Sequence, residues 1–144
     1  MYKRQRYIDA LKPIMTKRMD LAVAKGCDGV EPDNVDAYSN RTGRPLQPED
    51  QLRYNIMLAE EAHKRGLSIG LKNNLEQVRE LEPYFDWALN EECISYQECE
   101  MLLPFIDAGK AVFGAIYEHH ADDFCNYTNS LGYSFWQKLS LIHI

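Results

Sequence analysis

The sequence predicts an α/β protein, namely a TIM (β/α)8 barrel present only as its carboxyl-terminal half, with about four or five βα units. Helical and strand-like segments alternate along the chain, which is typical of parallel βαβ units. The strand-like segments are short and continuously apolar, as expected for strands covered on both faces. Polar side chains follow them at their carboxyl ends, where barrel enzymes build their active sites.

An open, doubly wound sheet is the alternative architecture. That fold binds ligands through a glycine-rich loop after a strand, and no such loop follows any predicted strand. A complete barrel needs about 250 residues, whereas this chain has 144. We therefore expect part of a barrel.

The helices are predicted from apolar residues at helical spacing and from the glycines that end them. The first covers residues 6–26, and Pro13 is expected to kink it or to mark its true first turn. Later helices are predicted at 51–66, 73–85, 95–110 and 120–132. Capping-box patterns, Asn74 with Gln77 and Ser95 with Glu98, are expected to begin two of them.

The predicted strands are 28–33, 67–72, 85–90, 111–118 and 133–138, each a short apolar run. Polar residues stand at or just after their carboxyl ends. These are Asp33 and Asn34, Lys72 and Asn73, Asn90 and Glu91, Glu118, and Gln137 and Lys138. Since the carboxyl ends of parallel strands share one edge, we expect these groups to surround one barrel mouth.

Composition excludes several classes of function. The net charge of −6 argues against a nucleic-acid partner, which would require a basic surface. No apolar run is long enough to span a membrane. The four cysteines form no CxxC pair, so no metal site is expected. Cys93 and Cys99 are close in sequence and are equally compatible with a disulfide and with two free thiols.

Both ends of the chain resemble translated sequencing-adaptor DNA. The last six residues, LSLIHI, and the first five, MYKRQ, correspond to one transposon end read in opposite orientations. We therefore expect residues 1–5 and 139–144 to be non-native. Residues 6–138 are then the natural segment, an internal piece of a longer gene.

Two carboxylates at the ends of two predicted strands are the first candidates for chemistry. Asp33 is expected at the barrel mouth because Pro32 ends regular pairing there, although acids in this position also cap turns. Of Glu91 and Glu92, at most one can point into the mouth, because adjacent residues face opposite ways. Glycoside hydrolysis generally requires a pair of such carboxylic acids.

Lys72 and the aromatic residues leave alternatives open. Lys72 could pair with the acids, form a Schiff base as in aldolase barrels, or make a helix-start ion pair. Tyr38, Tyr96 and Tyr117 lie near strand ends and are favoured as sugar platforms, whereas Trp87 is expected in the core.

The chain resembles glycoside hydrolase family 114, the endo-α-1,4-polygalactosaminidases and their bacterial relatives, over residues 20–138. Four stretches stand in that family's order: GCDGVEPDNVDAYSNRTGRPL, DQLRYNIMLAEEAHKRGLSIGLKNN, FDWALNEECISYQEC and AGKAVFGAIYE. The resemblance implies a partial glycoside hydrolase TIM-barrel domain with Asp33 and Glu91 as its catalytic carboxylates. It implies a sugar cleft lined by Asn34, Asp36, Tyr38, Lys72, Asn73, Asn90 and Tyr117.

From this resemblance we expect cleavage of α-1,4-linked, galactosamine-rich polysaccharide by a two-carboxylate mechanism. Glu91 would be the acid, and Asp33 the nucleophile or general base. The expected partner is the polysaccharide, with no metal or other cofactor, no nucleic acid and no membrane. We expect a monomer at full length, located outside the cell or in the cell envelope. The alternatives are a non-catalytic carbohydrate-binding barrel and a lysine-dependent aldolase or lyase.

Overall fold

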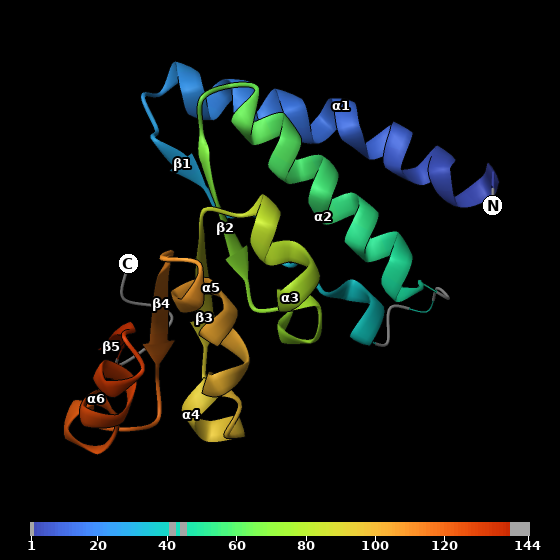
Figure 1. Ribbon diagram of the computed structural model, residues 1–144. Helices are drawn as coiled ribbons and strands as arrows, with labels where there is room; N and C mark the ends of the chain where they lie inside the picture. The colour runs from blue at the N-terminus through green and yellow to red at the C-terminus, as the bar shows by residue number, and fades with distance from the viewer. Residues whose placement is uncertain (1, 41–42, 44–45, 139–144) are drawn as a thin grey trace.

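A computed structural model describes residues 2–40, 43 and 46–138 (Figure 1). Five strands form one sheet in the order β1-β2-β3-β4-β5, and every neighbouring pair is parallel. The strands are β1 (Gly29–Val30), β2 (Ser68–Lys72), β3 (Trp87–Glu91), β4 (Ala111–Ile116) and β5 (Ser134–Gln137). The five predicted strands are confirmed, although β1 ends before the acidic residues that follow it.

The α-helices are α1 (Tyr2–Ala24), α2 (Pro48–His63), α3 (Val78–Leu81), α4 (Cys93–Tyr96), α5 (Leu103–Asp107) and α6 (Ala121–Ser130). Short 3-10 turns flank them: η1 (Ala37–Ser39), η2 (Leu75–Gln77), η3 (Glu82–Tyr84) and η4 (Cys99–Leu102). Residues 2–5 of the predicted non-native start lie in the first turns of α1. Residues 139–144 lie outside the described part of the chain.

The consecutive strand order distinguishes the two predicted architectures. Each connection advances by one strand in the same direction, and parallel crossovers are almost always right-handed. The helices therefore belong on one face of the sheet, as in a barrel, whereas a doubly wound sheet reverses direction and carries helices on both faces. The prediction of an α/β fold built from barrel-type βα units is confirmed.

The face beneath the helices is the hydrophobic core. Side chains alternate along each strand, so Ile69, Leu71, Ala88 and Val112 point to this face, and each is at most 1% exposed. The complete burial of these residues accounts for the apolar character of the strands in the sequence.

The opposite face of the sheet carries apolar side chains that the described helices do not cover. The Trp87 ring lies over Gly70, where an added Cβ would come within 2.3 Å of the ring, and it meets Phe113 edge to face. Trp87 is only half-buried and is not among the buried residues of the core, so its prediction as a core residue is not confirmed. Trp136, on the same face, is 43% exposed.

Two of the predicted helices are divided in the structure, and each contains a proline. Pro83 lies in the first turn of η3 and Pro104 in the first turn of α5, and the predicted helices 73–85 and 95–110 are each divided into short helical segments. The Asn74 side chain donates to the side chain of Gln77, whose backbone N–H bonds the Asn74 carbonyl instead, and neither predicted capping box forms. Pro13 lies inside α1 and does not mark its first turn.

The four cysteines form one disulfide and two free thiols. Cys93 and Cys99 are bonded, and both are buried beside the end of β3. Cys27 is exposed and Cys125 is half-buried, and both are free.

Glu61 connects the two long helices, which pack side by side in Figure 1. Its carboxylate accepts a hydrogen bond from Lys64 at 2.7 Å and one from Arg65 at 2.9 Å. It also lies 3.0 Å from Lys12 of α1. These contacts, that of Lys64 first, lower the pKa of Glu61 to about 2. The carboxylate therefore stabilises the junction of α1 and α2.

We predict that Glu61→Gln lowers the melting temperature by about 2–6 °C at pH 7. The folded-state pKa of Glu61 lies below its ordinary value of 4.5. Its contribution is therefore present above about pH 4.5 and lost as the pH falls toward 2. Thermal unfolding followed by circular dichroism at pH 7 and pH 3 measures both effects. The exposed neighbour Glu60 provides the control Glu60→Gln, and equal melting temperatures for the two variants would contradict the prediction.

Candidate active site

Three carboxylates and one lysine meet at the carboxyl-terminal end of the sheet. Lys72 ends β2, Glu91 ends β3, and Glu31 and Asp33 follow β1. The Lys72 Nζ donates a hydrogen bond to Asp33 Oδ2 at 3.0 Å. It lies 3.3 Å from Glu91 Oε2 and 3.5 Å from Glu31 Oε1. The two acids predicted to be catalytic are therefore brought together around one ammonium group.

Lys72 is a buried cation, with only 7% of its side chain exposed. Burial alone would lower its pKa. The hydrogen bond to Asp33 and the charges of Glu91 and Glu31 outweigh that effect, so the pKa of Lys72 is raised. An amine held in its charged form is a poor nucleophile, which favours the paired lysine over the Schiff-base alternative.

Contacts to both carboxylate oxygens fix the orientation of the Glu91 side chain. Oε1 accepts a hydrogen bond from the Tyr117 hydroxyl, and Oε2 faces Lys72. Burial, and then the bond to Glu91, raises the pKa of Tyr117 to about 12, so the phenol stays protonated and acts as a donor. The adjacent Glu92 points elsewhere, accepting from Ser95 Oγ and from the backbone N–H of Tyr117.

Two asparagines fix the loops beneath the carboxylates. Asn73 Oδ1 accepts hydrogen bonds from the Glu91 backbone N–H at 2.9 Å and from Asn90 Nδ2 at 3.2 Å. Asn90 Oδ1 accepts from the Cys93 N–H at 2.9 Å. Asn90 is only 1% exposed, and its amide is used within the fold. The ends of β2 and β3 are thereby joined to the loop that the disulfide closes.

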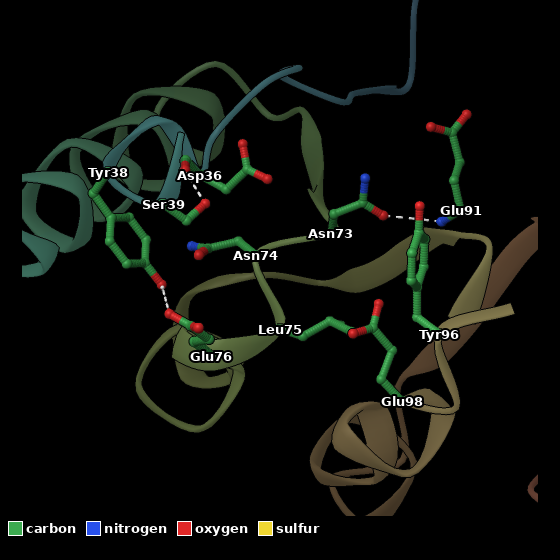
Figure 2. A pocket seen from close by; sticks show the side chains of 10 residues that line it. All are labelled: Asp36, Tyr38, Ser39, Asn73, Asn74, Leu75, Glu76, Glu91, Tyr96 and Glu98. Atoms are coloured by element: carbon green, nitrogen blue, oxygen red, sulfur yellow. Dashed lines mark hydrogen bonds between the residues drawn. The ribbon is translucent and has the colours of Figure 1, made fainter. Parts of the chain in front are cut away.

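A pocket of about 250 Å³ opens beside Glu91 (Figure 2). Its lining comes from η1, from the end of β2, from η2 and from the loop after β3. The lining residues are Asp36, Tyr38, Ser39, Asn73, Asn74, Leu75, Glu76, Glu91, Tyr96 and Glu98. Four of the residues predicted to line the sugar cleft, Asp36, Tyr38, Asn73 and Tyr96, thus surround this pocket together with Glu91.

Asn34 lies on the other side of Asp33. These two residues are joined by a cis peptide bond, and both are exposed. Together with Met15 and Arg18 of α1 and with Tyr54 they line a separate hollow between α1 and the loop after β1. Asp33 therefore lies between this hollow and the carboxylate cluster.

The sequence reasoning missed several polar residues around the site. In the predicted strand 28–33 Glu31 would share a face with Asp33, and this alternation is the one sequence signal for its position 3.5 Å from Lys72 Nζ. Glu76 accepts a hydrogen bond from the Tyr38 hydroxyl at 2.8 Å, across 38 residues of sequence, and Glu98 joins the pocket from the disulfide loop. No local pattern indicates either contact.

The described ranges, with their gaps at 41–42 and 44–45, hold no group of three or more His, Cys, Asp or Glu side chains arranged to bind a metal ion. Among the same residues, no helix combines the length and the apolar character needed to cross a bilayer.

Comparison with known proteins finds one matching family model and a similar solved structure. The sequence model of glycoside-hydrolase family GH114 matches residues 3–141. Curated protein sequences yield no match. A crystal structure of Ega3 from Aspergillus fumigatus in complex with galactosamine matches with a TM-score of 0.82 and 35% sequence identity.

That match covers 89% of this chain and 56% of the Aspergillus chain, so the protein spans little more than half the length of its structural relative. The family match extends over nearly the whole chain, and it agrees with the parallel βα units and with the paired acids at their carboxyl ends. The chain belongs to glycoside-hydrolase family GH114.

Proposed function

We propose that this chain carries the catalytic carboxylates of a glycoside hydrolase that cleaves α-1,4-linked, galactosamine-rich polysaccharide. The observation that supports it most directly is the position of Asp33 and Glu91 on the same Lys72 ammonium, at the active-site end of barrel-type strands. The Aspergillus relative binds galactosamine in its crystal structure, which supports an amino sugar as substrate.

In this proposal Glu91 is the general acid and Asp33 the nucleophile. The Asp33 carboxylate attacks the anomeric carbon while the glycosidic C–O bond breaks, and the leaving oxygen takes the proton of Glu91. Water then attacks the glycosyl ester, gives its proton to Glu91 and releases Asp33 as a carboxylate. Lys72 keeps a positive charge beside Asp33, and Tyr117 holds the carboxyl group of Glu91 in place.

The spacing of the acids favours this two-step course. Asp33 Oδ2 and Glu91 Oε2 lie 3.0 and 3.3 Å from Lys72 Nζ, so these oxygens are at most about 6.3 Å apart, below the about 6.5–9.5 Å typical of inverting enzymes. Retaining enzymes place their carboxyl groups about 5–5.5 Å apart. We therefore propose retention of the anomeric configuration.

The other two functions are less well supported. The raised pKa of Lys72 opposes aldolase chemistry, because a Schiff base needs a neutral amine. A barrel that only binds carbohydrate has no need of two acids converging on one cation. Product release from a defined oligosaccharide separates hydrolysis from binding alone.

We further propose that the isolated 144-residue chain is inactive and that the complete barrel works outside the cell or in the cell envelope. One face of the sheet leaves Trp136 exposed, and β1 and β5 are edge strands. The remaining barrel strands would cover both. The disulfide between Cys93 and Cys99 suits an oxidising compartment.

We predict that Asp33→Asn and Glu91→Gln each lower the hydrolysis of polygalactosamine by at least about 100-fold, because each removes a proton donor or nucleophile. The assay uses the chain within a complete barrel and measures reducing ends. Asp28 lies at the opposite end of β1 and is exposed, so Asp28→Asn is the matched control. Wild-type rates for both site variants would disprove the assignment.

We predict that the first product released carries the α configuration. A double displacement inverts the anomeric centre twice and so restores the configuration of the α-linked substrate. Proton NMR of a freshly started digest resolves the two anomers before mutarotation. A β product formed first would rule out Asp33 as nucleophile and would make it the general base instead.

We predict that Tyr117→Phe lowers kcat about 10-fold and leaves KM within about twofold, because it removes only the hydrogen bond that positions Glu91. Steady-state kinetics of the complete barrel measure both constants. Tyr84→Phe, at a partly exposed tyrosine of η3, serves as control. An increase in KM at constant kcat would assign Tyr117 to substrate binding instead.

A further inference from the structure

We propose that Glu31 is a positioning residue for the reaction: its carboxylate retains the Lys72 ammonium group between Asp33 and Glu91 through both chemical steps. This inference rests on the proposed function. It gives a role to the third carboxylate of the cluster, which a two-carboxylate mechanism does not use.

Glu31 reaches the cluster because of the register between β1 and β2. Val30 is paired with Ile69, and Ile69 is fully buried in the core beneath the helices. The next side chain of an extended chain points to the opposite face, and Pro32 favours an extended backbone at the residue before it. Glu31 therefore points to the face of the sheet that also carries Lys72.

The contacts of Glu31 are those of a lysine partner. Its Oε1 lies 3.5 Å from Lys72 Nζ, and its side chain is 26% exposed, compared with 44% for Asp33. Glu31 is not among the described residues that line the pocket beside Glu91. Burial raises the pKa of Glu31, and the charge of Lys72 opposes that rise. The ammonium group thus stabilises the ionised form of this half-buried carboxylate.

The proposed reaction moves a negative charge from one partner of Lys72 to another. In the first step Asp33 bonds to the anomeric carbon and becomes an ester, while Glu91 gives its proton to the leaving oxygen and becomes a carboxylate. In the second step the oxygen of water bonds to that carbon, its proton goes to Glu91, and Asp33 leaves as a carboxylate. Before and after each step, only one of these two acids carries a charge that pairs with the ammonium group.

Glu31 takes no part in either bond change, so its charge stays constant. Together with the one ionised catalytic acid it gives Lys72 two carboxylate partners at every stage. Without Glu31, the ammonium group would pair with a single acid at a time, first with Asp33 and then with Glu91. Such a pair stabilises the charge that has to react, which raises the barrier of each step.

Steady-state kinetics of Glu31→Gln in the complete barrel test this role. Glutamine keeps the shape of the side chain and can still accept a hydrogen bond, so the variant removes only the charge. We expect kcat to fall about 10-fold and KM to stay within about twofold, because the side chain holds Lys72 and not the sugar. Glu31→Asp keeps the charge, and its kcat should lie within about threefold of wild type.

A titration of Lys72 reports the same contact without catalysis. Burial lowers the pKa of Lys72, and the contacts with its three carboxylate partners more than offset that effect. NMR of the 144-residue chain with ¹³C-labelled lysine follows the Lys72 Cε signal against pH, and Lys72→Arg assigns it. We expect Glu31→Gln to move the midpoint to lower pH by about 0.5–1 pH unit, because one stabilising charge is lost.

The matched control in both experiments is Glu60→Gln, which makes the same change in net charge at an exposed position of α2. It should leave kcat and the Lys72 midpoint unchanged. Equal effects of Glu60→Gln and Glu31→Gln would assign them to overall charge and overturn the proposal. An unchanged kcat or midpoint in Glu31→Gln would also overturn it, as would a raised KM at constant kcat or a Glu31→Asp variant no faster than Glu31→Gln.

Failure of this inference is distinct from failure of the proposed function. If hydrolysis depends on Asp33 and Glu91 but not on Glu31, the positioning role alone is wrong. If Asp33→Asn and Glu91→Gln leave hydrolysis intact, the proposed function is wrong. A Lys72 midpoint that then still responds to Glu31→Gln would show that Glu31 holds the lysine independently of that function.

Discussion

The ammonium group of Lys72 is the interaction on which the rest of the site depends. Three carboxylates this close together would repel one another without a compensating charge. A shared cation lets Glu31, Asp33 and Glu91 lie within hydrogen-bonding or ion-pair distance of a single nitrogen. Because Glu31 and Asp33 follow β1, Lys72 ends β2 and Glu91 ends β3, the same group also links three consecutive strands at their carboxyl-terminal end.

Hydrogen bonds of two asparagine side chains support this cluster from below. Asn73 has a positive φ of 50°, which turns its side chain back to accept from the backbone of Glu91. Asn90 then holds the start of the loop that the Cys93–Cys99 disulfide closes. Each hydrogen bond satisfies a group that would otherwise be buried without a partner. The catalytic candidates are therefore held by the main chain as well as by charge.

The sequence was sufficient to predict the order of elements, because hydrophobic periodicity reports which faces are buried. It also predicted that Asp33, Lys72 and Glu91 meet, since parallel strands align their carboxyl ends. Contacts set by loop geometry were not predictable. Glu76 reaches Tyr38 only because η1 and η2 converge, and Pro83 and Pro104 lie where two of the predicted helices are divided. Trp87 was predicted as a core residue and is half-buried, because an apolar strand residue does not reveal which side of the sheet it occupies.

The consecutive order of the strands has a consequence for how the chemistry is inherited. Every polar group argued to act on the bond lies between Glu31 and Tyr117, in one uninterrupted stretch, and neighbours in sequence are neighbours in the sheet. A contiguous segment of this kind can be inherited as one piece of sequence. Recombination at either border would exchange the rest of the barrel, with the part of the cleft that it contributes, and would leave the reacting groups in register. Under the proposed catalytic roles, polysaccharide preference would then change by exchange of the other half of the barrel around this unaltered segment.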